Sequence, residues 1–355
     1  MEKDHSVEPR VRRDWGWPMT QLIQRYEEEM ALVRGGAAWT GLVLLLGALA
    51  ALPWLLPGYY VYILNFVGIN VIVAIGLNLL VGYTGQISLG HVGFVAIGAY
   101  AATHFIRATE ASGVVAALGG PFWMAVFIGG AAAAVFGVLV GLPAIRLEGP
   151  YLTIVTLGFG LAVQQILINW PAVSGGRIGM FVPQPALGSF VLGSDRSLYY
   201  LVWTVVIGMS LVAFNLTRSH VGRAFIAIRD SDIAAEVTGV NLKYYKTLAF
   251  AVSAFYAGAA GALLAYVMQY LEPTMFNLYE SIYYLAMVVV GGLGTIPGAM
   301  FGAVLLTLLQ YGLSHAQEYL PVIYGGIVIL VMALEPMGLY GRWLKIKLWM
   351  KTWPM

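Results

Sequence analysis

The sequence predicts an all-α polytopic membrane protein that crosses the bilayer about ten times. Hydrophobic residues make up 60% of the 355-residue chain and charged residues 10%, whereas soluble domains are about 45–50% apolar and about 25% charged. The mean hydropathy is +0.80. The apolar residues form long continuous runs, which indicate helices, because the strands of a membrane barrel would alternate apolar and polar residues.

Each predicted span is an apolar run long enough, or nearly so, to cross the hydrocarbon layer. The runs cover residues 37–56, 60–81, 87–106, 122–145, 151–170, 198–216, 247–271, 281–293, 298–315 and 320–334. They define a transmembrane domain at 37–336. Residues 1–36 include three consecutive glutamates, which the basic leader of a secretory signal lacks. We expect a cytoplasmic segment with a surface helix at 1–36, and a basic cytoplasmic tail at 337–355.

The positions of the basic residues predict which side of the membrane each connection faces. Arg34, Arg146, the segment 217–246 and the tail with Arg342 all fall on one side if the number of spans is even. Cytoplasmic loops carry the excess of Lys and Arg. Both termini and the segment 217–246 are therefore predicted to be cytoplasmic, in an inner (plasma) membrane. The more polar stretch 171–197 then forms an extracytoplasmic loop.

The segment 217–246 concentrates charge in an otherwise apolar chain. Its charged residues are Arg218, Arg223, Arg229, Asp230, Asp232, Glu236, Lys243 and Lys246. Asp230 and Ser231 are suited to cap a short helix, Asp232 suits its positive end, and Gly239 can close it. Asn241 is suited to cap the apolar helix that follows. A short capped helix between two spans predicts a docking element for a soluble partner, and an ordinary solvated loop is the alternative.

Two of the predicted spans are interrupted by glycine. The first interruption, VGYTGQISLGHVGFVAIGAY at residues 81–100, and the second, VGGLGTIPGAMFGA at residues 290–303, share the pattern V-G-x-x-G-[QT]-I. Such a repeat is expected of a transporter built from two related halves with discontinuous helices. Chance similarity between glycine-rich spans is the alternative. Gly294, Gly298 and Gly302 also recur at helical spacing, which favours close helix packing.

Polar side chains near the first interruption and in the fifth predicted span are candidates for a solute path. They are Thr84, Gln86, Ser88 and His91 after the interruption, and Thr153, Thr156 and Gln164 in the span 151–170. Unwound backbone at membrane depth is tolerated where it is buried in protein or lines a water-filled cavity. Glycine packing and interhelical hydrogen bonds explain these residues as well. His91 on its own is better explained as a core histidine.

Several classes of function are disfavoured by what the sequence lacks. It contains no cysteine, which excludes disulfides and thiolate chemistry. Glu272, Glu280, Glu318 and Glu335 fall at or near predicted span ends, and the lack of charge inside the spans disfavours a proton-coupled carrier. The chain has no Walker A, H-E-x-x-H or G-x-S-x-G pattern. If ATP drives transport, a separate chain must supply the ATPase.

Four blocks of the sequence carry a resemblance to a known family. They are GLNLLVGYTGQISLGHVGFVAIGAY, LEGPYLTIVTLGFG, SHVGRAFIAIRDSDIAAEVTGV and VVVGGLGTIPGAMFGA, in this order between residues 64 and 334. Together they resemble the LivM-type permeases of ABC importers, the membrane subunits of branched-chain amino acid uptake systems. The four blocks are specific for the family as a set, whereas each block alone is not.

The resemblance implies a permease that works with several partners. Two permease subunits, commonly one of the LivM type and one of the LivH type, enclose the path of a small polar solute. Two ABC ATPase subunits, which use ATP and magnesium, drive transport by alternating access, and an extracytoplasmic solute-binding protein delivers the solute. The chain itself is expected to hold no cofactor. The family's cytoplasmic coupling helix maps onto Arg223, Arg229, Asp230, Asp232, Ala234, Ala235, Glu236 and Gly239.

One segment departs from the family pattern. Family members often carry T-G-G-x-D-G after the fifth span, where this chain has SGGRIG, so the glycines persist and the acidic residue is missing. Contacts with the binding protein are expected from Ser174, Gly175, Gly176 and Arg177. These contacts, or the choice of solute, are expected to differ from those of the family.

The leading interpretation is therefore a non-enzymatic permease subunit for branched-chain or related small amino acids. Similar permeases import urea and short amides, so the solute stays open. A self-sufficient carrier or channel is a second hypothesis, which solute flux through liposomes holding this chain alone would support. A membrane-embedded enzyme has no nucleophile or metal constellation behind it. Membrane lipid surrounds the predicted spans, and nucleic acid is not an expected partner.

Overall fold

The computed structural model describes residues 36–342 except 113–120, 148, 185, 188–189, 192, 314–318 and 336–337. The surface helix predicted within 1–36 and the basic tail beyond Arg342 lie outside the described residues. The chain divides into two compact units, residues 1–44 and 45–355, and the account below concerns the second. The helix α2 (Gly36–Leu55) begins in the first unit and ends in the second.

The prediction of an all-α polytopic protein is confirmed. The long helices after α2 are α3 (Gly58–Thr84), α4 (His91–Ser112), α6 (Pro121–Ala144), α7 (Pro150–Asn169), α9 (Asp195–Arg218), α12 (Leu242–Met268), α13 (Leu278–Gly291), α14 (Ile296–Gly312) and α15 (Leu320–Leu334). Within the described residues, 6 helices are long and apolar enough to cross a membrane, and shorter apolar helices accompany them. The number of about ten spans stays a prediction.

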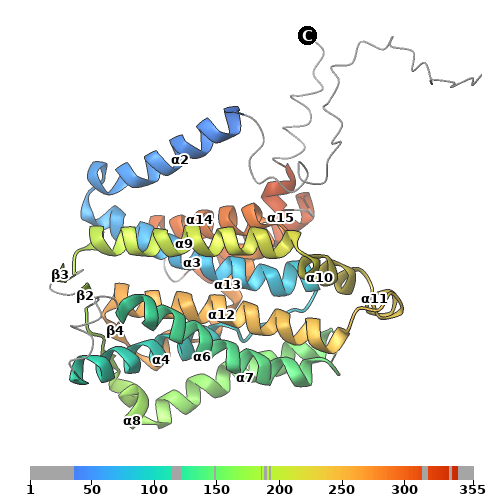
Figure 1. The fold of residues 1–355 in the computed structure, drawn as a ribbon, viewed down its shortest axis with the longest axis horizontal. Coiled ribbons are helices and arrows are strands. Elements are labelled where there is room, and N and C mark those ends of the chain that lie inside the picture. The colour runs from blue at the N-terminus through green and yellow to red at the C-terminus, as the bar shows by residue number, and fades with distance from the viewer. Residues whose placement is uncertain are drawn as a thin grey trace, which may run out of the picture. The chain divides into compact units, whose positions relative to one another are not determined.

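Short elements lie at the two ends of the helices. Figure 1 shows α10 (His220–Asp230) and α11 (Asp232–Val237) at one end, and the strands at the other. The segment after α7 forms α8 (Pro171–Ser174), the 3-10 turn η1 (Gly176–Ile178) and β1 (Met180–Phe181). The strand β1 pairs antiparallel with β4 (Tyr270–Leu271), and β2 (Ala186–Leu187) with β3 (Phe190–Val191). A second 3-10 turn, η2 (Pro273–Met275), follows β4.

Glycine allows three helices to cross at van der Waals contact in the core. A Cβ atom on Gly98 of α4 would collide with the backbone of Gly258 of α12, and a Cβ on Gly258 would collide with the carbonyl of Gly129 of α6. Such close approach replaces side-chain interdigitation with backbone contact, as is common between membrane helices. The helix α3 is the other central element, and its residues from Val67 to Thr84 are all buried.

The two glycine interruptions have different structures. After α3 ends at Thr84, Gly85 takes a left-handed conformation with φ of 71°, and a non-helical link over residues 85–90 leads into α4. The second interruption is a tight turn at residues 292–295 between α13 and α14. A second link, residues 269–277, joins α12 to α13 and contains β4 and η2. The predicted spans 247–271 and 281–293 place a connection at 272–280, close to this link.

The charged segment contains two helices where a single one is predicted. Asp230 is the last residue of α10 and does not start the next helix. Ser231 is the cap of α11, and its Oγ accepts a hydrogen bond from the Ala234 N–H at 3.3 Å. Asn241 caps α12 as predicted, with its Oδ1 accepting from the Tyr244 N–H at 3.1 Å. The extended conformation of Ser231, with ψ of 119°, separates the two helices.

Candidate functional site

The helix α10 is held against the membrane helices by an apolar face. Phe225 and Ile228 are buried, and Gly222 lies so close to the last turn of α9 that a Cβ would collide with the carbonyl of Thr217. Arg223 is exposed on the opposite face. Because α10 packs on α3, α9 and α12, a force applied to the charged segment reaches the membrane helices directly.

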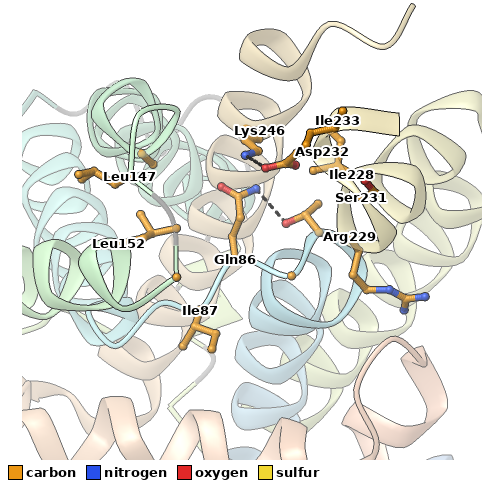
Figure 2. A pocket seen from close by; sticks show the side chains of 14 residues that line it. Gln86, Ile87, Leu147, Leu152, Ile228, Arg229, Ser231, Asp232, Ile233 and Lys246 are labelled. Atoms are coloured by element: carbon orange, nitrogen blue, oxygen red, sulfur yellow. Dashed lines mark hydrogen bonds and ion pairs between the residues drawn. The ribbon is translucent and has the colours of Figure 1, made fainter. Parts of the chain in front are cut away.

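Arg229 joins this segment to the end of α3. Its Nη1 donates a hydrogen bond to the Gly82 carbonyl oxygen at 3.2 Å, and its Nε and Nη2 donate to Asp230 Oδ1 at 3.2 and 3.1 Å. The carbonyl groups in the last turn of a helix carry partial negative charge, so a guanidinium group is stabilising there. The side chain of Arg229 therefore points to α3 and to Asp230, and away from the neighbouring cavity (Figure 2).

The two glycine motifs meet in space at the same point. The side-chain amide of Asn78 donates to the Thr295 carbonyl at 2.9 Å and accepts from the Gly294 N–H at 2.9 Å. A Cβ on Gly82 would collide with the Gly294 nitrogen, and a Cβ on Gly294 would lie 2.9 Å from Arg229 Nη1. The two V-G-x-x-G motifs, which begin at Val81 and at Val290, are thus packed together beside Arg229.

The short helix α11 has one face on the protein and one face exposed. Asp232 pairs with Lys246 at the start of α12, with 2.6 Å between Oδ2 and Nζ, and the Lys246 side chain is only 8% exposed. Ala235 is buried. Ile233 and Val237 are 78% and 83% exposed, one turn apart on the other face. Ala234, Glu236 and Gly239 are exposed as well.

A cavity of about 360 Å³ lies between the first link and the charged segment. Thr84, Gln86 and Ile87 contribute from the link, and Leu147 and Leu152 from the α6–α7 region. Ile228, Arg229, residues 231–233 and Lys246 line the other side. In Figure 2, the Gln86 side chain lies between Leu147 and Leu152 on one side and Asp232 on the other. Its Nε2 donates to Thr84 Oγ1 at 3.0 Å. Two of the predicted path residues therefore meet the predicted coupling residues here.

Hydroxyl groups from two different helices bond the backbone at the end of the link and at the start of α4. The Leu89 N–H donates to Thr156 Oγ1 of α7 at 3.2 Å, and the Val92 N–H donates to Ser281 Oγ of α13 at 3.1 Å. These bonds satisfy backbone donors that a helix cannot satisfy at its start. Thr156 is thus brought to the link as a structural partner. Ser281 was not identified from the sequence, since a lone serine near a span end carries no distinctive pattern.

The other predicted path residues are placed differently from one another. Ser88 and His91 are fully buried, and their side-chain polar atoms have no hydrogen-bond partner within the described part of the chain. Thr153 bonds back to the Gly149 carbonyl of its own helix, and Gln164 donates to the Pro273 carbonyl at 3.4 Å. The structure therefore brings only Thr84, Gln86, Ser88, His91 and Thr156 together around the link.

The residues predicted to contact a binding protein mostly form a turn. Ser174 is buried, and its hydroxyl donates to the Leu167 carbonyl and accepts from the Gly176 N–H at 2.9 Å. Gly175 and Gly176 have φ of 75° and 65°, which favours glycine at both positions. Arg177 is exposed at the surface of this turn, next to Ile178, which is 83% exposed.

A second cavity, of about 320 Å³, lies among α3, α12, α13 and α14. Its wall is mainly aromatic, and Glu280 in the first turn of α13 also lines it. The sequence analysis placed Glu280 at a span end. The structure places it on the wall of the same cavity as Asn70, which lies near the middle of the 27-residue helix α3.

Comparison with known proteins identifies the family. The family model described as branched-chain amino acid transport system / permease component matches residues 59–334. The high-affinity branched-chain amino acid transport system permease protein LivM of Escherichia coli is 35% identical over 242 residues, which cover 61% of this chain and 57% of that protein. The permease protein LivH of Salmonella typhimurium is 26% identical over 200 residues, which cover 53% of this chain and 64% of that protein.

A third relative, the permease protein BraD of Pseudomonas aeruginosa, is 30% identical over 171 residues, or 45% of this chain and 55% of that protein. The chain thus spans between half and two thirds of the length of the relatives it matches. No solved structure matches it significantly. The matched residues contain most of the apolar helices, and these helices make the chain a multi-pass membrane protein. The chain belongs to the family of permease components of branched-chain amino acid transport systems, as its LivM-type resemblance predicts.

Proposed function

We propose that this chain is a membrane-spanning permease subunit of an ATP-driven ABC importer that translocates branched-chain or related small amino acids by alternating access. The observation that carries the proposal is the contact of Arg229 with Gly82, where a cytoplasmic segment meets both glycine motifs. Family membership supports the transport role, and the names of the relatives support the solute class. The chain itself is a transport subunit and not an enzyme.

The proposed partners supply what this chain lacks. This chain has no Walker A pattern with which to bind ATP. Two ABC ATPase subunits therefore bind ATP and magnesium in its place. A second permease subunit of the LivH type completes the path, and a solute-binding protein docks on the extracytoplasmic side. The chain lies in the inner membrane with both termini in the cytoplasm, as the distribution of basic residues favours.

The docking surface for the ATPases is the exposed face of α11. Ile233 and Val237 form an exposed apolar pair on the short helix α11, where solvent exposure of two aliphatic side chains is unfavourable by about 1.5–3 kcal/mol each relative to full burial. The acidic residues Asp230 and Glu236 are exposed in the same segment. An apolar centre with a charged rim is typical of a protein–protein contact.

Movement of α11 reaches the membrane helices by two connections. The Asp232–Lys246 pair leads to the first turn of α12, and Arg229 leads to the end of α3. The cavity of about 360 Å³ lies between these connections and the non-helical link. We infer that closure of the ATPases shifts α10 and α11 and thereby changes the width of this cavity. The link, with its polar residues Gln86 and Ser88, forms part of the solute path.

The docking surface is tested by the substitution Ile233→Asp. The introduced aspartate would be buried against the ATPase without a partner for its charge. The ATPase subunits are therefore expected to be lost during co-purification of the complex. Ile178→Asp is the matched control, because Ile178 is 83% exposed at the opposite end of the molecule. Retention of the ATPases by the Ile233→Asp variant would contradict the proposed docking surface.

A further inference from the structure

Glu280 is the acidic side chain of the aromatic cavity among α3, α12, α13 and α14, and the mechanism above does not use it. The same carboxylate, with Tyr283 and Gln310, also lines an adjacent cavity of about 590 Å³ that extends toward α15. Both volumes fall in the range of small-molecule sites, about 300–1,000 Å³. Glu280 therefore lines two cavities, each of a size that suits a small-molecule solute.

The position of this cavity is deep in the membrane domain. Asn70, which lines it, is the thirteenth residue of α3 and lies about 18 Å along the helix axis from Gly58. Val92, the second residue of α4, lines it as well. The cavity thus contacts the start of both discontinuous helices, α4 and α13, at the depth where transporters with broken helices place their solute.

The charge of Glu280 is uncompensated within the described part of the chain. Its backbone N–H donates to Asn277 Oδ1 at 3.3 Å, but its carboxylate forms no hydrogen bond or ion pair with any described residue. No lysine, arginine or histidine lines either cavity among these residues. A carboxylate in a medium of low dielectric constant is unfavourable unless a positive charge accompanies it. A cationic group in this cavity would compensate the carboxylate.

The aromatic wall suits the same occupant. The rings of Tyr62 and Phe66 lie 4.9 Å apart between centroids, and those of Phe66 and Tyr311 lie 5.8 Å apart, so the three rings form one continuous surface of the cavity. The faces of aromatic rings attract ammonium groups. Leu264 and Met268 add aliphatic surface that accommodates a hydrocarbon side chain.

We propose that the Glu280 cavity binds the ammonium group of the transported solute, with the rings of Tyr62, Phe66 and Tyr311 around it and the aliphatic wall against its side chain. The proposal rests on the proposed transport function, since it makes this cavity a station on the solute path. It also selects among solute classes. Amino acids carry an ammonium group, whereas urea and short amides are neutral and gain nothing from the carboxylate.

The test uses three probes with one branched carbon skeleton. They are 3-methylbutylamine, which is cationic, 3-methyl-1-butanol, which is neutral, and 3-methylbutanoate, which is anionic. Binding is measured by calorimetry on the full chain assembled with its partner permease and ATPases in lipid nanodiscs. The amine is expected to bind at least about tenfold more tightly than the alcohol, because an interaction with a charged partner is lost in the alcohol. The anion is expected not to bind.

Matched variants assign this preference to Glu280. Glu280→Gln is expected to weaken amine binding at least about tenfold while leaving the affinity for the alcohol unchanged, and Glu280→Asp is expected to restore part of the amine preference. Glu272→Gln is the control, because Glu272 accepts a hydrogen bond from Thr274 and lines neither cavity. Equal affinities for amine and alcohol in the native chain, or unchanged amine affinity in Glu280→Gln, would overturn the proposal.

Uptake of labelled L-leucine by proteoliposomes that hold the complete transporter separates this proposal from the transport function. If leucine enters but amine binding does not depend on Glu280, the site is refuted and the transport function stands. If amine binding depends on Glu280 but the native complex takes up no amino acid, the transport function is refuted and the cation site stands.

Discussion

A single guanidinium group bonds the end of α10 to the last turn of α3. Arg229 is 39% exposed in its side chain, so its bond to the Gly82 carbonyl contributes at the lower end of the range for charged hydrogen bonds, about 1.5–3 kcal/mol. Its importance comes from its position rather than from its strength. The bond ends where Gly82, Gly294 and Asn78 are in contact.

The substitution Arg229→Ala removes this connection without touching the docking face of α11. We expect the ATPase subunits to stay bound and the rate of solute uptake per ATP hydrolysed to fall about tenfold, the factor that corresponds to about 1.4 kcal/mol. Uptake and ATP hydrolysis are measured on the same proteoliposomes. Lys243→Ala is the control, because Lys243 is exposed in the same segment. An unchanged coupling ratio in Arg229→Ala would show that force is transmitted elsewhere.

Individual residues also show the limit of inference from sequence. The caps Ser231 and Asn241 were predictable, because a short polar side chain before an apolar helix has a local cause. Asn78 and Ser281 were not, because their partners lie 216 or 217 and 189 residues away in the chain. A polar residue within an apolar span indicates an interaction but does not name its partner.

At the scale of elements, the chain repeats one arrangement. A helix of 27 residues, a link and a shorter helix occur as α3, residues 85–90 and α4, and again as α12, residues 269–277 and α13. In this order of elements, the link after α12 corresponds to the first interruption. The V-G-x-x-G motif at 290–303 lies at the next junction, between α13 and α14, and the internal repeat of the two motifs stays a prediction.

The glycine crossing of α4, α6 and α12 fixes how closely these elements approach. Gly98→Ala places a methyl group where the backbone of Gly258 lies, and overpacking of this kind costs about 1–3 kcal/mol. We expect a lower midpoint of thermal unfolding in detergent. Gly208→Ala in α9 is the control, since nothing lies within 4 Å of its added Cβ, and alanine is the better helix former by about 1 kcal/mol. Equal midpoints for the two variants would contradict backbone contact at Gly98.

At the scale of the whole molecule, the class of the protein was predictable from its composition, and the order of the helices from the positions of its apolar runs. Long apolar runs leave few alternatives to membrane helices. The cavities were not predictable, because each is lined from several helices that are distant in sequence. Glu280 illustrates the reason: its place near the end of an apolar run suggested a membrane surface, whereas it lines a cavity together with Asn70 of α3.

The absence of cysteine allows a direct test of the proposed orientation. Single cysteines are introduced by Arg177→Cys and Glu236→Cys, both at exposed positions on opposite ends of the helices. A maleimide that cannot cross membranes is expected to label the cysteine at position 177 in intact cells with the outer membrane opened. It is expected to label the cysteine at position 236 only after the inner membrane is permeabilised. The reverse pattern would invert the proposed topology.

The hydroxyl groups of Thr156 and Ser281 each hold one backbone N–H where the unwound segment enters α4. Each such hydrogen bond contributes about 0.5–1.5 kcal/mol net, so releasing both requires only the few kcal/mol that separate interconverting conformations. We therefore expect this junction to rearrange while the glycine-packed helices stay together. A transporter built this way would change its opening through a short strip of backbone and keep its helical core intact.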